Sequence, residues 1–257
     1  MNLVIQKIIL AVRQLADEQN CASIHWLFVT KQEHEELTSY DFHPRLSFQF
    51  HWHNSGFTNF AEFLAQLNSR HRKQIRKERT QALACVDSVD FIRGEEISQD
   101  ELSAMDRFYR KTTWAHGGMD YLQPGFFHHL LQMMPERVRI ARVRKNGAMI
   151  AGAFYLQKAD TLYGRYWGCD EEIRYLHFET AYYAGIDYCI QQKLNVFEAG
   201  AQGEHKLLRG FLPALTYSNH WIRHPGLAAG IDRFLSQERQ AVLAHMDELA
   251  KLCPYKQ

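Results

Sequence analysis

Apolar residues recur at helical spacing near the start of the chain, over residues 3–19. The spacing predicts an amphipathic helix whose apolar stripe consists of Leu3, Ile5, Ile8, Ile9, Val12 and Leu15. Residues 46–52 alternate instead, which predicts a strand with one apolar face formed by Leu46, Phe48, Phe50 and Trp52. Residues 1–10 lack a basic leader and a small-residue cleavage site, so we interpret them as part of the helix and not as a signal peptide.

The same two patterns predict the elements of the remaining chain. Helices are predicted over residues 31–37, 60–67, 69–82, 98–114, 124–134, 175–193 and 227–252. Strands are predicted over residues 23–30, 86–92, 137–143, 148–156, 161–167, 194–199 and 214–222. Asn146-Gly147 joins two of these strands as a hairpin turn. A meander followed by helix–strand units predicts a mixed α/β sheet, and a change of composition near Ser55–Phe60 marks the candidate domain boundary.

Composition excludes several classes of protein. Of the 257 residues 46% are hydrophobic and 23% charged, which is typical of a folded globular chain. The net charge of +1 means that any basic site is local. No apolar run approaches the roughly 18–20 residues of a membrane-spanning helix. The five cysteines are scattered and never in C-x-x-C spacing, which argues against a disulfide scaffold or thiolate zinc site and favours a reducing, cytoplasmic location.

Cations concentrate in one segment, RHRKQIRKERT at residues 70–80. On a helix, Arg72, Arg76 and Arg79 share one stripe because they lie four and three residues apart. Such a stripe can hold the phosphates of a polyanion, and Arg72, Lys73 and Arg76 are the candidate residues. The alternative is an ordinary solvated helix face.

A second candidate segment is LYGRYWGC, residues 162–169. Strict alternation on a strand places Tyr163, Arg165, Trp167 and Cys169 on one face, and Leu162, Gly164, Tyr166 and Gly168 on the other. Arg165 then lies between two aromatic rings and needs a carboxylate partner or an anionic ligand. Tyr163, Arg165 and Trp167 are therefore candidate substrate-binding residues, and the alternative is a buried Arg–Glu pair.

The helix over residues 175–193 carries an unusual carboxylate. Glu179 shares an apolar face with Tyr183, Ile186 and Ile190, whereas His177 lies on another face with Ala181, Ala184 and Tyr188. A carboxylate in such surroundings is paired, with Arg165 as one candidate partner, or has a raised pKa suited to proton transfer. A structural ion pair is the alternative.

The segment FEAGAQGEHKLLRGF, residues 197–211, is the first candidate for the site. A short strand carrying Glu198 ends in a glycine-rich turn, and a brief helix begins with Glu204, His205 and Lys206. Titratable groups at the C-terminal end of a strand lie where α/β sheets usually bind ligands. A metal site is not expected, because neither His51 with His53 nor His220 with His224 has a third ligand at a recognisable spacing.

Several of these segments together resemble a known family. The motifs are HWHN (51–54), RHRKQIRKERT, FYRKTTW (108–114), YLQPGFF (121–127), LYGRYWGC, LHFETAYYAGIDYCI (176–190) and FEAGAQGEHKLLRGF. They are similar to bacterial peptidoglycan biosynthesis/recognition proteins, which are FemAB-related members of the GNAT (N-acetyltransferase-like) superfamily. The resemblance implies a GNAT-like acyl-CoA N-acyltransferase fold: one complete domain over residues 61–257, preceded by a partial GNAT-like segment over residues 1–60.

The resemblance also implies an activity. Fem-type enzymes join two GNAT-like domains and transfer amino acids from aminoacyl-tRNA to the amine of a peptidoglycan precursor. Because only part of the first domain is expected here, the chain is a fragment, a short natural form, or dependent on a partner, for example as a homo-oligomer. An acyltransferase of peptidoglycan precursor metabolism is therefore the leading hypothesis, with a peptidyl or small-molecule amine as acceptor and tRNA as a candidate partner.

The acyl donor stays open between acyl-CoA and aminoacyl-tRNA. GNAT enzymes bind the CoA pyrophosphate at the segment corresponding to GCDEEIRYLHFE, whose acids Asp170, Glu171 and Glu172 would repel it. Candidate proton-transfer residues are Glu204 and His205, followed by Glu179 and Glu198. Arg165, Lys206 and Arg209 are candidates for binding an anionic group of the substrate. The alternatives are a non-catalytic module that recognises a cell-wall precursor or polyanion, and an atypical CoA-dependent N-acetyltransferase.

Overall fold

The computed structural model describes residues 3–201 and 203–256 and divides the chain into two compact units. Unit 1 contains the residues up to Gln49 together with Pro213–Lys251. Unit 2 contains Phe50–Leu212 together with the residues from Leu252 onward. Strand β2 (His43–His53) begins in unit 1 and ends in unit 2. The interpretation of residues 1–60 as part of a preceding GNAT-like domain stays a prediction.

Unit 1 is built around three neighbouring strands, one of which is the first part of β2. Its other elements are α1 (Leu3–Glu18), β1 (Ser23–Val29), α2 (Lys31–Thr38), β8 (Leu212–Ile222) and α9 (Pro225–Lys251). Strand β1 pairs with β8, with Ser23 opposite Ile222. A capping box at Thr30 begins α2, where the Thr30 side chain accepts a hydrogen bond from the backbone of Glu33. The core of this unit joins α1, β1 and α2 through Ile9, Ala16, Ile24, Leu37 and Phe42.

Unit 2 has a larger mixed sheet with helices on both faces. Its elements before the meander are α3 (Phe60–Gln66), α4 (Ser69–Leu83), β3 (Ser88–Arg93), η1 (Gly94–Glu96), α5 (Gln99–Ala115), α6 (Phe126–Met133) and η2 (Pro135–Arg137). The meander and the elements after it are β4 (Val138–Lys145), β5 (Ala148–Lys158), β6 (Thr161–Cys169), α7 (Leu176–Phe178), the π-helical turn η3 (Glu179–Tyr183), α8 (Ala184–Gln191), β7 (Val196–Glu198) and η4 (Glu204–Arg209).

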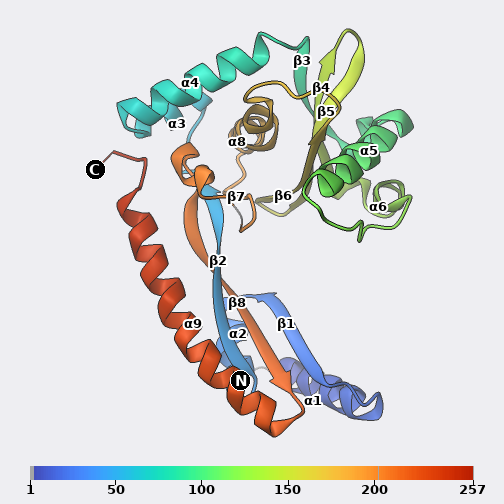
Figure 1. The fold of residues 1–257 in the computed structure, drawn as a ribbon, viewed down its shortest axis with the longest axis vertical. Coiled ribbons are helices and arrows are strands. Elements are labelled where there is room, and N and C mark those ends of the chain that lie inside the picture. Colours follow the sequence, from blue (N-terminus) through green and yellow to red (C-terminus); the bar gives the residue numbers. More distant parts are fainter. Residues whose placement is uncertain (1–2, 202, 257) are drawn as a thin grey trace. The chain divides into compact units, whose positions relative to one another are not determined.

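The strand order in unit 2 is β7-β6-β5-β4-β3, and the last residues of β2 pair with β7. Strands β3 to β6 are antiparallel, and Asn146 and Gly147 adopt the positive φ angles that the predicted β4–β5 hairpin turn requires. Helices α5 and α6 pack on one face of the sheet around Met105, Phe108 and Phe127. The continuous helix α7–η3–α8 covers the other face, and α4 packs outside it (Figure 1).

Strands β6 and β7 are parallel but pair only over Thr161–Tyr163 and Val196–Glu198. Beyond these residues β6 continues to Cys169, whereas β7 ends in the loop that leads to η4. The two strands therefore part in the middle of the sheet, and the backbone of β6 beyond Tyr163 is no longer bonded to β7. This parting gives the sheet an opening at the C-terminal end of β7.

Strand β6 contains a β-bulge that the alternating pattern does not predict. Phe154 pairs with Tyr166 but Tyr155 pairs with Gly164, so Arg165 is the extra residue of the bulge. The bulge reverses the facing of the residues before it. Tyr163 lies on the α5 face with its partner Leu156, whereas Trp167 packs near Leu176 on the α7 face. The prediction that Tyr163, Arg165 and Trp167 share one face is therefore wrong.

In the part of the chain that the structure describes, no helix has the length and apolar character needed to cross a membrane. All five cysteines have free thiols. The location in the cytoplasm stays a prediction.

Candidate functional site

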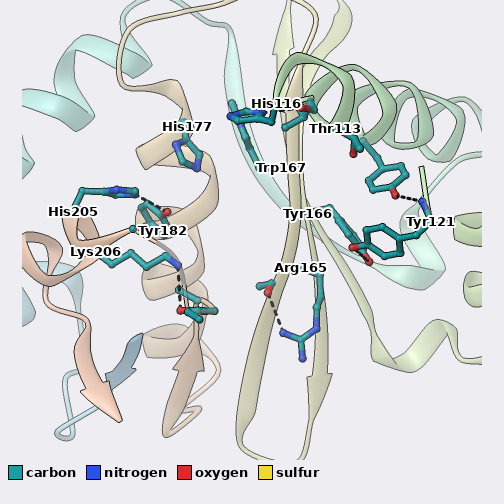
Figure 2. Close-up of a pocket in the computed structure, with 17 residues that line it drawn as sticks. Thr113, His116, Tyr121, Arg165, Tyr166, Trp167, His177, Tyr182, His205 and Lys206 are labelled. Carbon is teal, nitrogen blue, oxygen red and sulfur yellow. Dashed lines mark hydrogen bonds between the residues drawn. The ribbon is translucent and has the colours of Figure 1, made fainter. Parts of the chain in front are cut away.

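A cavity of about 760 Å³ opens where β6 and β7 part (Figure 2). Its walls come from α5 and the loop after it, from β6, from the α7–η3 segment, and from the loop between β7 and η4. The lining residues are Tyr109, Thr112, Thr113, His116, Tyr121, Gly164, Arg165, Tyr166, Trp167, His177, Tyr182, Ala199, Gly200, Ala201, Gly203, His205 and Lys206. A smaller pocket of about 140 Å³ shares several of these residues and reaches Ala153, Tyr155 and Ala181. The cavity lies entirely within unit 2.

The turn η4 places His205 at the edge of the cavity. Gly203 and Gly210 flank η4 with φ angles of +93° and +91°, the left-handed region that favours glycine. A Cβ atom on Gly203 would also lie 2.4 Å from Cε1 of His205, so this glycine lets the imidazole fold back over the loop. His205 keeps contact with solvent, but its ring is partly desolvated among His177, Phe178 and Tyr182. Its Nε2 lies 3.0 Å from the hydroxyl of Tyr182.

Lys206 is the buried cation of the cavity. Only 5% of the residue is exposed, and Nζ donates a hydrogen bond of 3.2 Å to the carbonyl of Gly200. The ammonium also lies 5.9 Å from the ring centroid of Phe50. Burial lowers the pKa of Lys206 to about 8. The side chain is therefore mostly protonated near neutrality but exchanges its proton within one or two pH units of it.

The π-helical turn η3 aims two side chains at the cavity from the same helix. His177 and Tyr182 are five residues apart, yet their rings lie 5.3 Å from each other because a π-turn contains more residues than an α-turn. Burial lowers the pKa of His177 to about 4, and nearby His205 adds to this effect. Burial likewise raises the pKa of Tyr182 to about 12. Both groups are neutral over the physiological range.

The opposite wall of the cavity is held by a group of tyrosines. The hydroxyl of Tyr109 accepts hydrogen bonds from the backbone N–H groups of Tyr121 and Leu122, at 3.2 and 3.3 Å. The hydroxyl of Tyr121 in turn donates to that of Tyr166 at 3.2 Å (Figure 2). These bonds fix the loop after α5 beside Thr113 and His116, which face the same cavity.

The predicted residues Lys206 and Arg209 behave differently although they lie on one turn. Arg209 is 7% exposed, is not among the residues lining the cavity, and lies 3.4 Å from the ring centroid of Phe178. Its Nε and Nη2 donate to the carboxylate of Glu78, and its Nη1 donates to the carbonyl of His205. The guanidinium of Arg209 therefore forms its hydrogen bonds within the protein, on the side of η4 away from the cavity, and does not face a substrate.

Four of the charged residues predicted for the site do not converge on one point: Arg165, Glu179, Glu198 and Glu204. Arg165 is exposed at the bulge and donates to the carbonyl of Gly164. Glu198 lies 3.9 Å from Nε2 of His51, and burial raises its pKa. Glu204 is exposed and does not line the cavity.

Glu179 lies on the opposite side of η3 from the cavity. Its carboxylate accepts two hydrogen bonds from Arg79, at 3.1 and 3.0 Å, and this arginine also bonds Asp187. The interpretation that pairs Glu179 with Arg165 is therefore wrong, because the π-turn and the bulge place these two side chains on different sides. Burial nevertheless raises the pKa of Glu179, and Arg79 opposes the shift.

The basic helix α4 is predicted correctly, but its stripe is not. Asn68 caps the helix by accepting a hydrogen bond from the backbone of His71. Arg79 turns inward to Glu179, while Lys73 and Arg76 are exposed and Arg72 is half-buried. The exposed cationic face also includes Arg70 and Lys77.

Sequence reasoning missed the aromatic and hydroxyl part of the site, namely Tyr109, Thr113, His116, Tyr121 and Tyr182. Residues 108–114 and 121–127 were recognised only as family motifs, and their side chains converge through the loop after α5. No periodic signal marks Tyr182, since the π-turn rotates it away from its α-helical position. Among the described residues, no group of three or more potential metal ligands is found.

The fold defined by this parting sheet is shared with known structures. The crystal structure of FemX matches with a TM-score of 0.62 at 10% identity, covering 88% of this chain and 78% of that chain. The structure of L-PGS from Bacillus licheniformis matches with a TM-score of 0.57 at 7% identity, covering 87% of this chain and 76% of that chain. At such identities the likeness concerns the fold alone. It confirms the predicted mixed α/β fold of the Fem type.

A comparison with protein-family models identifies the family within this fold. The model of the FemAB-like family, described as peptidoglycan biosynthesis/recognition, matches residues 2–257. The chain therefore belongs to the FemAB-like family, as its motifs predict. No curated protein matches the chain.

Proposed function

We propose that this protein transfers an acyl or aminoacyl group to an amine acceptor in peptidoglycan precursor metabolism. The observation that carries the proposal is the cavity at the parting of β6 and β7, where the His205–Tyr182 pair and the buried ammonium of Lys206 face one space. Membership of the FemAB-like family supports the metabolic setting. FemX and L-PGS share the fold, which agrees with a common scaffold but does not identify a substrate.

The proton transfer is assigned to His205. Burial lowers its pKa, and the cations Arg209 and Lys206 lower it further, so the imidazole is neutral near pH 7. It takes a proton from the attacking amine as the new C–N bond forms. The proton then passes to the leaving sulfur or oxygen of the donor as its bond to the acyl carbon breaks. The hydroxyl of Tyr182, 3.0 Å from Nε2, orients the ring during both transfers.

Lys206 is assigned the stabilisation of the oxyanion that forms during the reaction. During attack, negative charge develops on the carbonyl oxygen of the acyl group, and a fixed buried cation stabilises that charge more than it stabilises the neutral carbonyl. The hydrogen bond to Gly200 holds the ammonium in place before the substrate binds. Glu204, Glu198 and Glu179 receive no proton-transfer role in this proposal, since none of them lines the cavity.

Both donor classes fit the proposal. Asp170 bonds Arg107 and lies near Lys111, and Glu171 bonds Lys145, so two of the three acids expected to repel a pyrophosphate are neutralised by neighbours. An aminoacyl-tRNA would instead use the exposed cations of α4 for its backbone phosphates. The recognition module without catalysis is the remaining alternative. A homo-oligomer or a missing N-terminal half also stay predictions.

The test measures transfer from two labelled donors, acetyl-CoA and bulk aminoacyl-tRNA, to a lysine-containing muropeptide. We expect His205→Gln to reduce turnover by about a hundredfold or more, the range of a general base, while donor binding is retained. His129→Gln is the control, because His129 is an exposed histidine on α6 outside the cavity. Full turnover by His205→Gln would contradict the assignment. Muropeptide binding without transfer from either donor would favour the recognition module.

A further inference from the structure

Behind η4, on the side away from the cavity, lies a buried carboxylate that the proposed chemistry does not use. Glu78 projects from α4 and is only 1% exposed. It is not among the residues that line the cavity. A charge buried to this degree is costly unless it is paired and hydrogen-bonded, so its partners indicate what it holds in place.

The first partner connects Glu78 to His205. Arg209 donates from Nη2 and Nε to the two oxygens of Glu78, at 2.7 and 3.1 Å, in a bidentate pair. The same guanidinium donates from Nη1 to the backbone carbonyl of His205 at 2.7 Å. The carbonyl of His205 is thus anchored to α4 through one rigid planar group.

The second partner connects Glu78 to Tyr182. The hydroxyl of Tyr183 donates a short hydrogen bond to Glu78, and Tyr183 itself is fully buried. Tyr183 is the neighbour of Tyr182 on the π-helical turn η3. One carboxylate therefore holds both segments whose side chains meet in the His205–Tyr182 hydrogen bond.

We propose that Glu78 is a positioning residue, which sets the distance between His205 and Tyr182 by anchoring η4 through Arg209 and η3 through Tyr183. The proposal rests on the proton-transfer role proposed for His205. Its physical reason is that η4 is a short turn between two flexible glycines, Gly203 and Gly210, and needs an external anchor to keep one geometry.

A matched carboxylate elsewhere in unit 2 separates positioning from simple stability. Glu101 is 5% exposed and accepts hydrogen bonds from Arg142 and Arg144, at 2.7 and 2.9 Å. It also accepts from the backbone of Ser98 at the start of α5. Glu101 and these partners lie outside the cavity lining, so its loss weakens a buried ion pair without touching η4.

The experiment compares Glu78→Gln with Glu101→Gln in the full chain, at a temperature where both variants are folded. Because an error of about 1 Å in a reacting group costs up to about a hundredfold in rate, we expect Glu78→Gln to lower kcat tenfold to a hundredfold with little change in KM. Glu101→Gln should lower Tm but leave kcat unchanged. Equal losses of kcat in both variants, or no loss in Glu78→Gln, would overturn the proposal.

A paired substitution guards against misfolding. Glu78→Met combined with Arg209→Met removes both buried charges, a replacement that is often neutral or stabilising. The carbonyl of His205 nevertheless loses its anchor. We expect a Tm near that of the wild type with kcat still reduced at least tenfold. Wild-type kcat in this double variant would show that the pair contributes stability only.

A spectroscopic measurement keeps the proposal testable when no transfer is detected. The imidazole signals of His205 are followed by NMR against pH in the wild type, Glu78→Gln and Glu101→Gln. Since the charge of Glu78 raises the pKa of His205 against the effect of Arg209, the titration should move to lower pH in Glu78→Gln alone. An unchanged titration contradicts the Glu78–Arg209–His205 arrangement on which the positioning role rests, whereas absent transfer with the expected shift overturns only the proposed function.

Discussion

The two sides of the η3–η4 region bury charge in opposite ways. On the cavity side, Lys206 is buried and His177 is half-buried, and among the described residues neither forms an ion pair. Burial lowers their pKa values to about 8 and about 4, so His177 is neutral near pH 7. On the α4 side, charged groups are buried in pairs, as in Glu78 with Arg209 and Glu179 with Arg79. Both sides use the continuous helix that contains η3 and the turn η4, and the paired side adds Glu78 and Arg79 from α4.

The difference teaches which buried charges are available for chemistry. A paired charge already has its hydrogen bonds, and a substrate would have to break them. An uncompensated group is desolvated and keeps its interaction capacity for a ligand or a developing charge. On this basis Lys206 belongs to the site and Arg209 supports it, although both lie on η4.

The largest expected effect breaks the paired side. Replacing Arg79 with Met leaves Glu179, which is 2% exposed, without its bidentate partner. Removing one member of a buried pair costs about 3–5 kcal/mol of the free energy of unfolding. Chemical denaturation of Arg79→Met measures this loss, and kcat below the transition should stay at the wild-type value. A loss under about 1 kcal/mol would show that the pair is not structural.

This loss depends on pH in a defined direction. Burial raises the pKa of Glu179 while Arg79 opposes the shift, so removing Arg79 raises that pKa further. A carboxyl whose folded pKa is raised favours the folded state when protonated, and this contribution is lost as the pH rises through the folded pKa. The deficit of Arg79→Met should therefore be smaller at acidic than at neutral pH. A deficit independent of pH would argue against Glu179 as its source.

The sequence predicted the elements better than it predicted which side chains meet. Each predicted helix and strand is present within a few residues. The apolar face predicted for residues 46–52 is confirmed, since Phe50 and Trp52 are buried. The stripe predicted for residues 3–19 is wrong in part, because Leu3, Ile8 and Leu15 are exposed and the buried face of α1 runs through Ile9 and Ala16. The site depends instead on two local irregularities. The bulge at Arg165 and the π-turn at Glu179–Tyr183 each shift a register by one residue, and neither leaves a periodic signal.

The contacts between side chains around η4 could not be predicted from the sequence pattern either. Lys206 and His205 were found from their place after a glycine-rich turn, but their roles relative to Arg209 depend on which side of η4 each side chain takes. In the sequence, Glu78 is the single acid within the basic segment 70–80, and nothing there marks it as a functional residue. Its burial and its bond to Arg209, 131 residues away, come from tertiary packing that helical spacing does not encode.

The second prediction tests the role of Lys206, the unpaired cation on the cavity side. If the ammonium of Lys206 stabilises the oxyanion, kcat should fall above about pH 8 by roughly tenfold per pH unit, as the amine loses its proton. Lys206→Met should reduce kcat by about 10²–10³-fold at pH 7, the range for loss of one oxyanion donor.

The control for Lys206 is substitution by arginine, whose guanidinium stays charged up to about pH 12. In Lys206→Arg the decrease of kcat above about pH 8 should disappear, whatever fraction of the wild-type rate remains. A decrease that persists in this variant assigns the titration to another group. Measurement of kcat against pH for the wild type, Lys206→Met and Lys206→Arg separates these outcomes.

The smallest expected effect concerns the outer face of α4, where cations are exposed, in contrast to the paired Arg79 on its inner face. If Lys73 and Arg76 contact the phosphates of a tRNA, each loss should flatten the dependence of log affinity on log salt by about 0.7–0.9. Fluorescence titration of labelled tRNA at several salt concentrations measures this slope for Lys73→Ala, Arg76→Ala and the double variant. Lys158→Ala, at the exposed end of β5, removes the same charge elsewhere and should leave the slope unchanged. Equal slopes in all variants would show that this face is only solvated, and the donor would then be sought among the acyl-CoA thioesters.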